Sequence, residues 1–307
     1  MITLRYHIAS LCAMILILGI GIWIGLSIGP PEVEKQQTDL LKASSKKLDD
    51  VLQERQLDAQ MLSQNRQALA GLVPHFTHGM LFGKRVCVIR TGDYPDAAQA
   101  AIDALAPTGA TVASSVTVSG QLDMTTDKQR SEMLGPLESA VPSAAAPDNS
   151  TLIHIIVQAL KLGTANHQDL QDAVDRMSSA GVISYSGDFQ QPVDLVIVVG
   201  GASSDPGEMD TSDEQARERM VLTELVATNE FATTAVVGCE PREVDTSSVP
   251  VFQEAGIGSV DCIDEPLGTL DIVYALHGET AAYGIKPGSS LLAPASLESE
   301  NTGGWQP

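Results

Sequence analysis

Three side chains that lie close together in the sequence have the chemistry to hold a soft metal ion. His75 and His78 are three residues apart, and Met80 follows two residues later. Imidazole nitrogen and thioether sulfur are ligands that suit copper. Two copies of this segment, brought together in a dimer, would complete a metal site. The alternative is an ordinary connection, because the chain has no M-x-x-M, no H-x-H and no cluster of methionines.

A second candidate is the glycine-rich segment Gly200–Gly207 (GGASSDPG), which follows the apolar run at 194–199. Open α/β sheets bind ligands at the carboxyl ends of their strands, so this segment could serve a small-ligand sensor. It matches neither G-x-G-x-x-G nor G-x-x-x-x-G-K-[ST], and the next helix is predicted only from Ser212. An ordinary loop is the alternative interpretation.

The cysteines do not follow a metal-binding pattern. Cys12 lies in an apolar segment, while Cys87, Cys239 and Cys262 lie in the rest of the chain, without C-x-x-C or zinc spacing. Cys239 and Cys262 both end predicted strands and could form one disulfide. Alternatively, all three are buried and behave as small hydrophobic side chains.

No pattern supports catalysis. No serine or cysteine lies in a nucleophile-elbow sequence, and carboxylates are so frequent that no pair stands out. We therefore predict a protein that is not an enzyme, without catalytic or cofactor-binding residues.

The charge of the chain is strongly negative. The net charge is −21, and residues 83–307 hold 11 basic against 32 acidic side chains. A surface of this sign cannot bind nucleic acid by neutralising phosphates. Aromatic residues make up only 4% of the chain, so aliphatic side chains must fill the core.

Residues 8–28 contain 21 residues without a charge, which is long enough for a helix that crosses a bilayer. The segment exceeds the apolar core of a signal peptide, and no A-x-A cleavage pattern follows it. It therefore predicts a single-pass anchor in the cell membrane. Basic residues occur on both sides of it, but the short N-terminal stub favours an extracytoplasmic body.

Residues 32–73 predict one long polar helix with a heptad pattern. Four leucines recur at multiples of seven residues, and Arg55 occupies the missing position. Such a helix needs a partner, so we predict a homodimer or a heteromeric coiled coil. The leucines expected at the contact are Leu41, Leu48, Leu52, Leu62 and Leu69.

From residue 74 onward, short apolar runs alternate with helical patterns. The predicted strands are 85–89, 111–118, 194–199, 233–238 and 259–263. The predicted helices are 95–106, 121–141, 168–179, 212–229 and 267–277, and 152–162 is either a helix or a strand. This alternation favours a Rossmann-like, doubly wound and mostly parallel sheet.

The predicted organisation therefore has four parts. The stub and anchor occupy 1–31, the coiled-coil helix 32–73 and the α/β domain 74–286, whose first ten residues form a hinge. A flexible tail covers 287–307, which is rich in glycine, serine and proline.

Several segments resemble the copper transporter (MctB) family over almost the whole chain. They are LRYHIAS near the start, FGKRVCVIRTGD at 82–93, SVDCIDEPLGTLDIVYALHG at 259–278 and YGIKPGSSLLAP at 283–294. The resemblance implies copper transport or homeostasis at the cell envelope, with copper as the bound metal. These motifs define no known active site, so no functional residue is carried over.

The residues themselves also suit an alternative. Some relatives in this family look like envelope proteins that pair through a coiled coil and control cell-wall hydrolases. An anchor, a spacer helix and an acidic domain fit such a non-enzymatic adaptor, which would dock an envelope partner such as a cell-wall hydrolase regulator.

Overall fold

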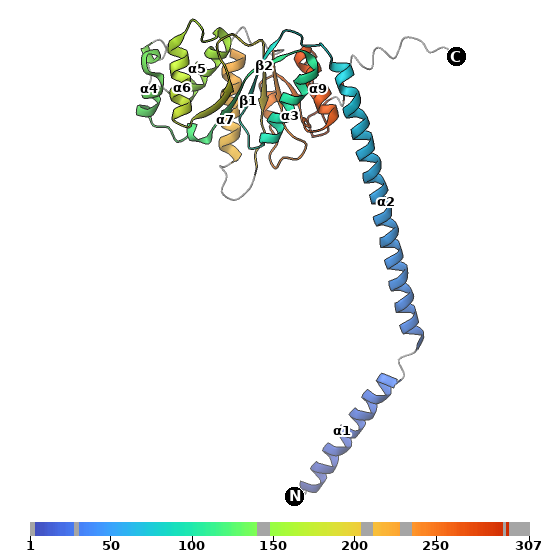
Figure 1. Ribbon diagram of the computed structural model, residues 1–307. Coiled ribbons are helices and arrows are strands. Elements are labelled where there is room, and N and C mark those ends of the chain that lie inside the picture. The colour runs from blue at the N-terminus through green and yellow to red at the C-terminus, as the bar shows by residue number, and fades with distance from the viewer. Residues whose placement is uncertain are drawn as a thin grey trace, which may run out of the picture. The chain divides into compact units, whose positions relative to one another are not determined.

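The computed structural model describes residues 4–27, 31–139, 148–203, 211–227, 235–290 and 293–294. The chain divides into a unit from Met1 to Asn65 and a compact unit from Arg66 to Pro307. Figure 1 shows the helices of the first unit and the α/β arrangement of the second.

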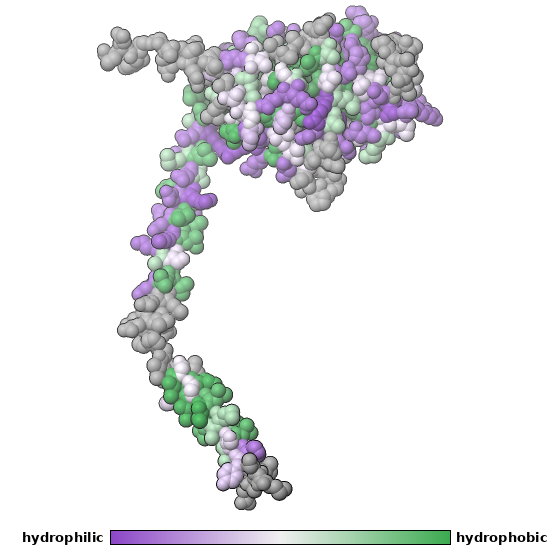
Figure 2. Space-filling model, turned by 180° about the vertical axis from the view of Figure 1, so that it is seen from behind, coloured by the Kyte–Doolittle hydropathy of each residue, from purple (hydrophilic) through white to green (hydrophobic). Residues whose placement is uncertain are grey.

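The first helix, α1 (Leu4–Ser27), carries Arg5 and His7 near its start and is without charge from Ile8 onward. Its segment Tyr6–Gly25 is long and apolar enough to cross a membrane, and none of it is buried within the chain. Hydrophobic residues cover most of this helix in Figure 2, and hydrophilic ones gather toward its N-terminal end. The prediction of one N-terminal apolar helix is confirmed.

The second helix, α2 (Pro31–Thr77), has 47 residues and continues four residues beyond the predicted end. It passes through Pro74, which cannot donate a backbone hydrogen bond. Val73 and Thr77 are buried, and the Thr77 hydroxyl donates to the Val73 carbonyl at 3.0 Å. Packing of this last turn offsets the missing bond, so residues 74–77 are helical and the turns begin at His78.

Within the described ranges, seven strands form one mostly parallel sheet in the order β3-β2-β1-β4-β5-β6-β7. Only the β2–β3 pair is antiparallel. The strands are β1 (Arg85–Arg90), β2 (Thr111–Val118), β3 (Ile183–Gly187), β4 (Leu195–Val199), β5 (Val236–Cys239), β6 (Gly258–Val260) and β7 (Ala282–Tyr283). The mixed α/β prediction with a mostly parallel sheet is confirmed.

Helices cover both faces of this sheet. The longer ones are α3 (Pro95–Leu105), α4 (Asp127–Leu134), α5 (Asn149–Leu162), α6 (Gln168–Ser179), α7 (Thr211–Ala227), α8 (Val249–Glu254) and α9 (Pro266–His277). Three short 3-10 helices are η1 (Ala106–Thr108), η2 (Gly120–Leu122) and η3 (Gly135–Ser139). One aliphatic core lies under α4 to α8, and a second lies under α3 and α9. Figure 1 shows α5, α6 and α7 together, apart from α3 and α9.

Most predicted elements lie where the pattern placed them, with two refinements. Residues 152–162 are helical, as part of α5. The predicted helix 121–141 is instead divided into η2, α4 and η3. The division follows from local geometry, because Thr126 caps α4 with a reciprocal hydrogen-bond box and Gly135 adopts a positive φ of 56° at its end.

Candidate functional site

The three predicted metal ligands lie at the end of α2 and in the turn after it. His75 is in the last turn of the helix and His78 directly follows it, and both side chains are exposed. Met80 is only partly exposed, because it packs against the core under α3 and α9. The imidazoles are therefore accessible to a soluble metal ion, whereas the Met80 thioether is partly occupied by packing.

The thiols of the α/β unit are structural. Cys87, Cys239 and Cys262 are buried and free, so the interpretation as small hydrophobic side chains is confirmed over a disulfide. Burial raises the pKa of Cys87 and of Cys262 to about 12, and it also raises the pKa of Cys239. All three thiols are buried, so they are not accessible to a metal ion from solution.

The glycine-rich segment after β4 is only partly described, since residues 204–207 lie outside the described ranges. Gly201 has a φ of +98°, which favours glycine, and its N–H donates to Ser248 Oγ at 2.8 Å. The backbone N–H of Ser203 donates to Asp93 Oδ2 at 2.9 Å. The segment is thus tied to the loop after β1 and to the residue before α8, and α7 begins at Thr211.

A layer of buried polar side chains lies beside this segment, at the carboxyl ends of the parallel strands. Thr91 follows β1, Glu240 follows β5 and Asp261 follows β6. All three are at most 2% exposed, and Glu218 from α7 is equally buried among them. These residues were not predicted as candidates, because acidic side chains are so frequent in the chain. The position directly after a predicted strand was the signal that could have separated them from the rest.

Glu218 is the centre of the layer. Its Oε1 lies 3.5 Å from the Thr91 hydroxyl, and it also forms a hydrogen bond with Ser248. Burial raises the pKa of Glu218 to about 8, and the nearby charge of Glu240 acts in the same direction. The side chain is therefore mostly protonated at neutral pH and donates as well as accepts hydrogen bonds.

At the carboxyl ends of the strands, the backbone of Gly200 lies very close to the side chains of Glu218 and Ser248. A methyl group there would lie 2.0 Å from Glu218 Oε1 and 2.5 Å from Ser248 Oγ.

We expect Gly200→Ala to lower the free energy of unfolding by about 1–3 kcal/mol, because buried neighbours cannot move aside without strain. Denaturant unfolding followed by circular dichroism measures this change. Gly71→Ala is the matched control, since nothing lies within 4 Å of that position in α2. An equal loss in both variants would contradict a steric cause.

The other end of the layer is held by charged hydrogen bonds. The Lys286 ammonium lies 2.6 Å from Glu240 Oε1, and both groups are buried or nearly so. Asp261 accepts hydrogen bonds from the backbone N–H groups of Ile285 and Lys286 and from the Ser289 hydroxyl. These contacts fix the segment after β7 against the strand ends.

Asp271, on α9, differs from its neighbours in having no such contacts. It is fully buried, and neither of its carboxyl oxygens has a hydrogen-bond partner. Burial and the nearby charge of Asp261 raise its pKa to about 8. At neutral pH this side chain is mostly a neutral carboxylic acid.

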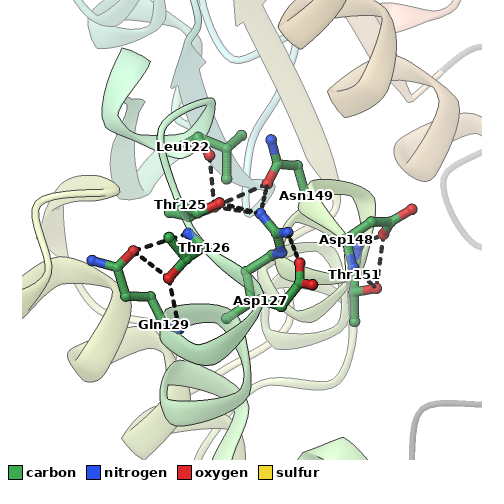
Figure 3. Close-up of polar contacts among 9 residues, drawn as sticks. Leu122, Thr125, Thr126, Asp127, Gln129, Asp148, Asn149 and Thr151 are labelled. Carbon is green, nitrogen blue, oxygen red and sulfur yellow. Dashed lines mark hydrogen bonds and ion pairs between the residues drawn. The ribbon is translucent and has the colours of Figure 1, made fainter. Parts of the chain in front are cut away.

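A polar pocket of about 610 Å³ lies where β1 and β2 end and β3 begins. Its wall includes η2, and the loop after η2 carries Asp123. Figure 3 shows the contacts that hold this loop, where the Thr125 hydroxyl bonds both the Leu122 carbonyl and Asn149 Oδ1. The capping boxes of α4 and α5 lie on either side of these contacts. The pocket therefore has a rigid wall.

No group of three or more His, Cys, Asp or Glu side chains is arranged to hold a metal ion within the described parts of the chain. His75 and His78 with Met80 would thus form a site of at most three donors from one copy. The arrangement suits a metal held transiently, or one shared between copies, better than a closed structural centre.

Comparison with known proteins gives one family. The family model described as "Copper transport outer membrane protein, MctB" matches residues 1–294. A search of the curated proteins found no match.

Proposed function

Because this chain belongs to the MctB copper transport outer membrane protein family, we propose that it is a membrane-anchored envelope protein with a role in copper transport or homeostasis. The observation that carries this proposal is the extent of the match, which includes both the apolar helix and the α/β unit. The family is related to transport, and we propose no enzymatic activity for the chain.

We further propose how the parts are arranged. Residues 8–28 cross the cell membrane once, and residues 32–73 form a coiled coil with a second helix. The domain at 74–286 is Rossmann-like and lies outside the cytoplasm, and most of the tail predicted at 287–307 falls outside the described residues. The order of the first six strands along the sheet, 3-2-1-4-5-6, is the order of doubly wound dinucleotide-binding sheets and supports the assignment.

Copper would be cargo, held by His75, His78 and Met80. The exposure of both imidazoles supports this assignment, since the buried thiols are not accessible. Imidazole and thioether donors favour copper over hard cations. One apolar helix cannot enclose a pore, so a transport role would require several copies or another membrane protein.

We expect the full chain in detergent to bind copper(I) with defined stoichiometry, measured by competition with a chromogenic chelator under reducing conditions. The double variant His75→Ala/His78→Ala should bind at least about 100-fold more weakly, because it lacks two of three donors. The single variant Met80→Ala should lose less, since Met80 is partly occupied by packing.

Two control variants remove the same side chains elsewhere. His167 and His277 are also exposed, so His167→Ala/His277→Ala should leave copper binding unchanged, as should Met124→Ala. Equal binding by the unaltered chain and the His75/His78 variant would contradict the proposed ligands. Absence of specific binding would contradict copper as a ligand of this protein.

A second function is favoured by the surface of α2. Five leucines of the heptad pattern are between 46% and 71% exposed, which is unusual for a helix without a partner. They are Leu41, Leu48, Leu52, Leu62 and Leu69. We propose that α2 pairs with a second helix, either from another copy or from an envelope partner such as a cell-wall hydrolase regulator. In that function the protein is an adaptor.

A further inference from the structure

The pocket at the ends of β1 and β2 has no part in the copper function. Its volume of about 610 Å³ lies within the range of small-molecule sites. It lies outside the carboxyl ends of parallel strands, which is where open α/β sheets place ligands. Its walls carry both guanidinium and carboxyl groups, and these groups define which ligand fits.

The positive side of the pocket is Arg90, at the end of β1. One guanidinium nitrogen, Nη1, donates to the Gly92 carbonyl at 3.0 Å. Within the described residues, no carboxylate lies at ion-pair distance from Arg90. The second guanidinium, that of Arg217, is already engaged by Asp123 at 3.3 Å and by the Thr91 carbonyl at 3.2 Å. Arg90 therefore remains to hold an anionic group.

The negative side is formed by Glu214 from α7 and Asp93 from the loop after β1. Glu214 is 5% exposed and lines the pocket, and its buried Oε2 has no hydrogen-bond partner. Burial and a hydrogen bond with Asp93 raise the pKa of Glu214 to about 8, so Glu214 is mostly protonated at neutral pH. Arg217 favours the ionised form of Glu214, and Glu218 opposes it. Arg217 is itself paired with Asp123, so an ammonium group of a ligand would add a second cation beside Asp93 and Glu214.

We propose that this pocket binds a small zwitterion, such as an amino acid or short peptide, with its carboxylate on Arg90 and its ammonium group on the Asp93–Glu214 pair. A bidentate bond from a guanidinium suits a carboxylate. The ammonium group would donate to carboxyl oxygens of Asp93 and Glu214, both of which line the pocket. The hydroxyls of Ser119 and Ser184 also line the pocket and can bond the polar atoms between the two charges.

The specificity of the pocket follows from its two charges together. A ligand with only a carboxylate would make no charged contact with the Asp93–Glu214 pair. A ligand with only an amine would leave Arg90 without an anionic partner. Buried groups without partners weaken binding, so loss of either ligand charge should be costly. This site does not depend on the copper function and could fail or succeed independently of it.

The test uses the full chain in detergent and isothermal titration calorimetry with three probes. They are alanyl-alanine, its N-acetylated form without an ammonium group, and its C-terminal amide without a carboxylate. We expect alanyl-alanine to bind at least about 10-fold more tightly than either blocked form. Failure of alanyl-alanine to bind at about 10 mM, or equal binding of a blocked form, would overturn the proposal. This comparison needs no variant, so it holds even if substitutions impair folding.

Two variants then assign the charges to residues. Arg90→Gln should abolish the preference of the pocket for the free carboxylate, so that the dipeptide and its amide bind alike. Glu214→Gln should abolish the preference for the free ammonium group. Arg219→Gln is the matched control, since Arg219 lies on α7 and pairs with the exposed Glu254. A folded Arg90→Gln variant that still discriminates the carboxylate would overturn the assignment.

Discussion

The substitution Leu48→Asp is expected to weaken self-association of the full chain by about 1,000-fold or more. Burial of one leucine side chain stabilises an interface by about 2 kcal/mol, and a homodimer loses this contribution from both helices. The resulting loss of about 4 kcal/mol corresponds to three orders of magnitude in the dissociation constant. Leu48 is 60% exposed in the single chain, so the substitution should leave the α/β unit folded.

Light scattering of the detergent-solubilised chain over a range of concentrations measures this effect. Leu62→Asp should repeat the result, because Leu62 lies two heptads further along the same face. Gln53→Asp introduces the same charge five residues after Leu48, on the opposite face, and should leave the dimer intact. A dimer that survives both leucine substitutions would contradict pairing through α2. An unaltered chain that is monomeric throughout would leave only the heteromeric coiled coil.

The variant Asp271→Asn is expected to be more stable than the unaltered protein at pH 8 and about equally stable near pH 4. Below about pH 4, Asp271 holds its proton in both the folded and the unfolded chain. Between about pH 4 and pH 8 the unfolded chain releases this proton while the folded chain retains it. Folding stability should therefore fall with rising pH by up to about 1.4 kcal/mol for each pH unit, and the loss stays constant above the folded pKa.

Denaturant unfolding monitored by circular dichroism, repeated at several pH values, measures the slope. The free energy of unfolding should fall most steeply in the unaltered chain, where Asp271, Glu214 and Glu218 all contribute. Burial raises the pKa of each of these three groups to about 8. Asp271→Asn should remove the contribution of the Asp271 carboxyl to the dependence of the free energy of unfolding on pH. Asp58→Asn, on the exposed surface of α2, is the control and should preserve it. An unchanged slope in the Asp271 variant would show that this carboxyl ionises normally in the folded protein.

The apolar patterns of the sequence were sufficient for the centre of the sheet. The five predicted strands correspond to β1, β2, β4, β5 and β6. β1, β4 and β5 are short apolar runs with buried side chains on both faces, whereas β2 shows a β-branched, alternating pattern. The two edge strands were missed for opposite reasons. β3 is mostly polar and exposes most of its residues, while β7 has only two residues and gives no periodic signal.

The charged groups could not be assigned in the same way. Periodicity separates buried from exposed positions only when the buried side chain is apolar. Glu214 and Glu218 lie in a predicted amphipathic helix, where acidic residues ordinarily face solvent, yet both are buried under the strand ends. Their burial results from the crossing of α7 over the sheet edge, which depends on residues more than 100 positions earlier in the chain. His75 and His78 were predicted to lie in a hinge, but His75 lies in the last turn of α2 and His78 directly follows that helix. Their role in metal binding remains a prediction.

The buried thiols bear on how this fold tolerates its chemical surroundings. A thiol is attacked by oxidants mainly as the exposed thiolate, and Cys87, Cys239 and Cys262 are neither exposed nor ionised. The α/β unit therefore needs no disulfide to fold and should resist sulfenic acid formation. Its stability should be the same in a reducing as in an oxidising compartment, even where a redox-active metal generates peroxide nearby.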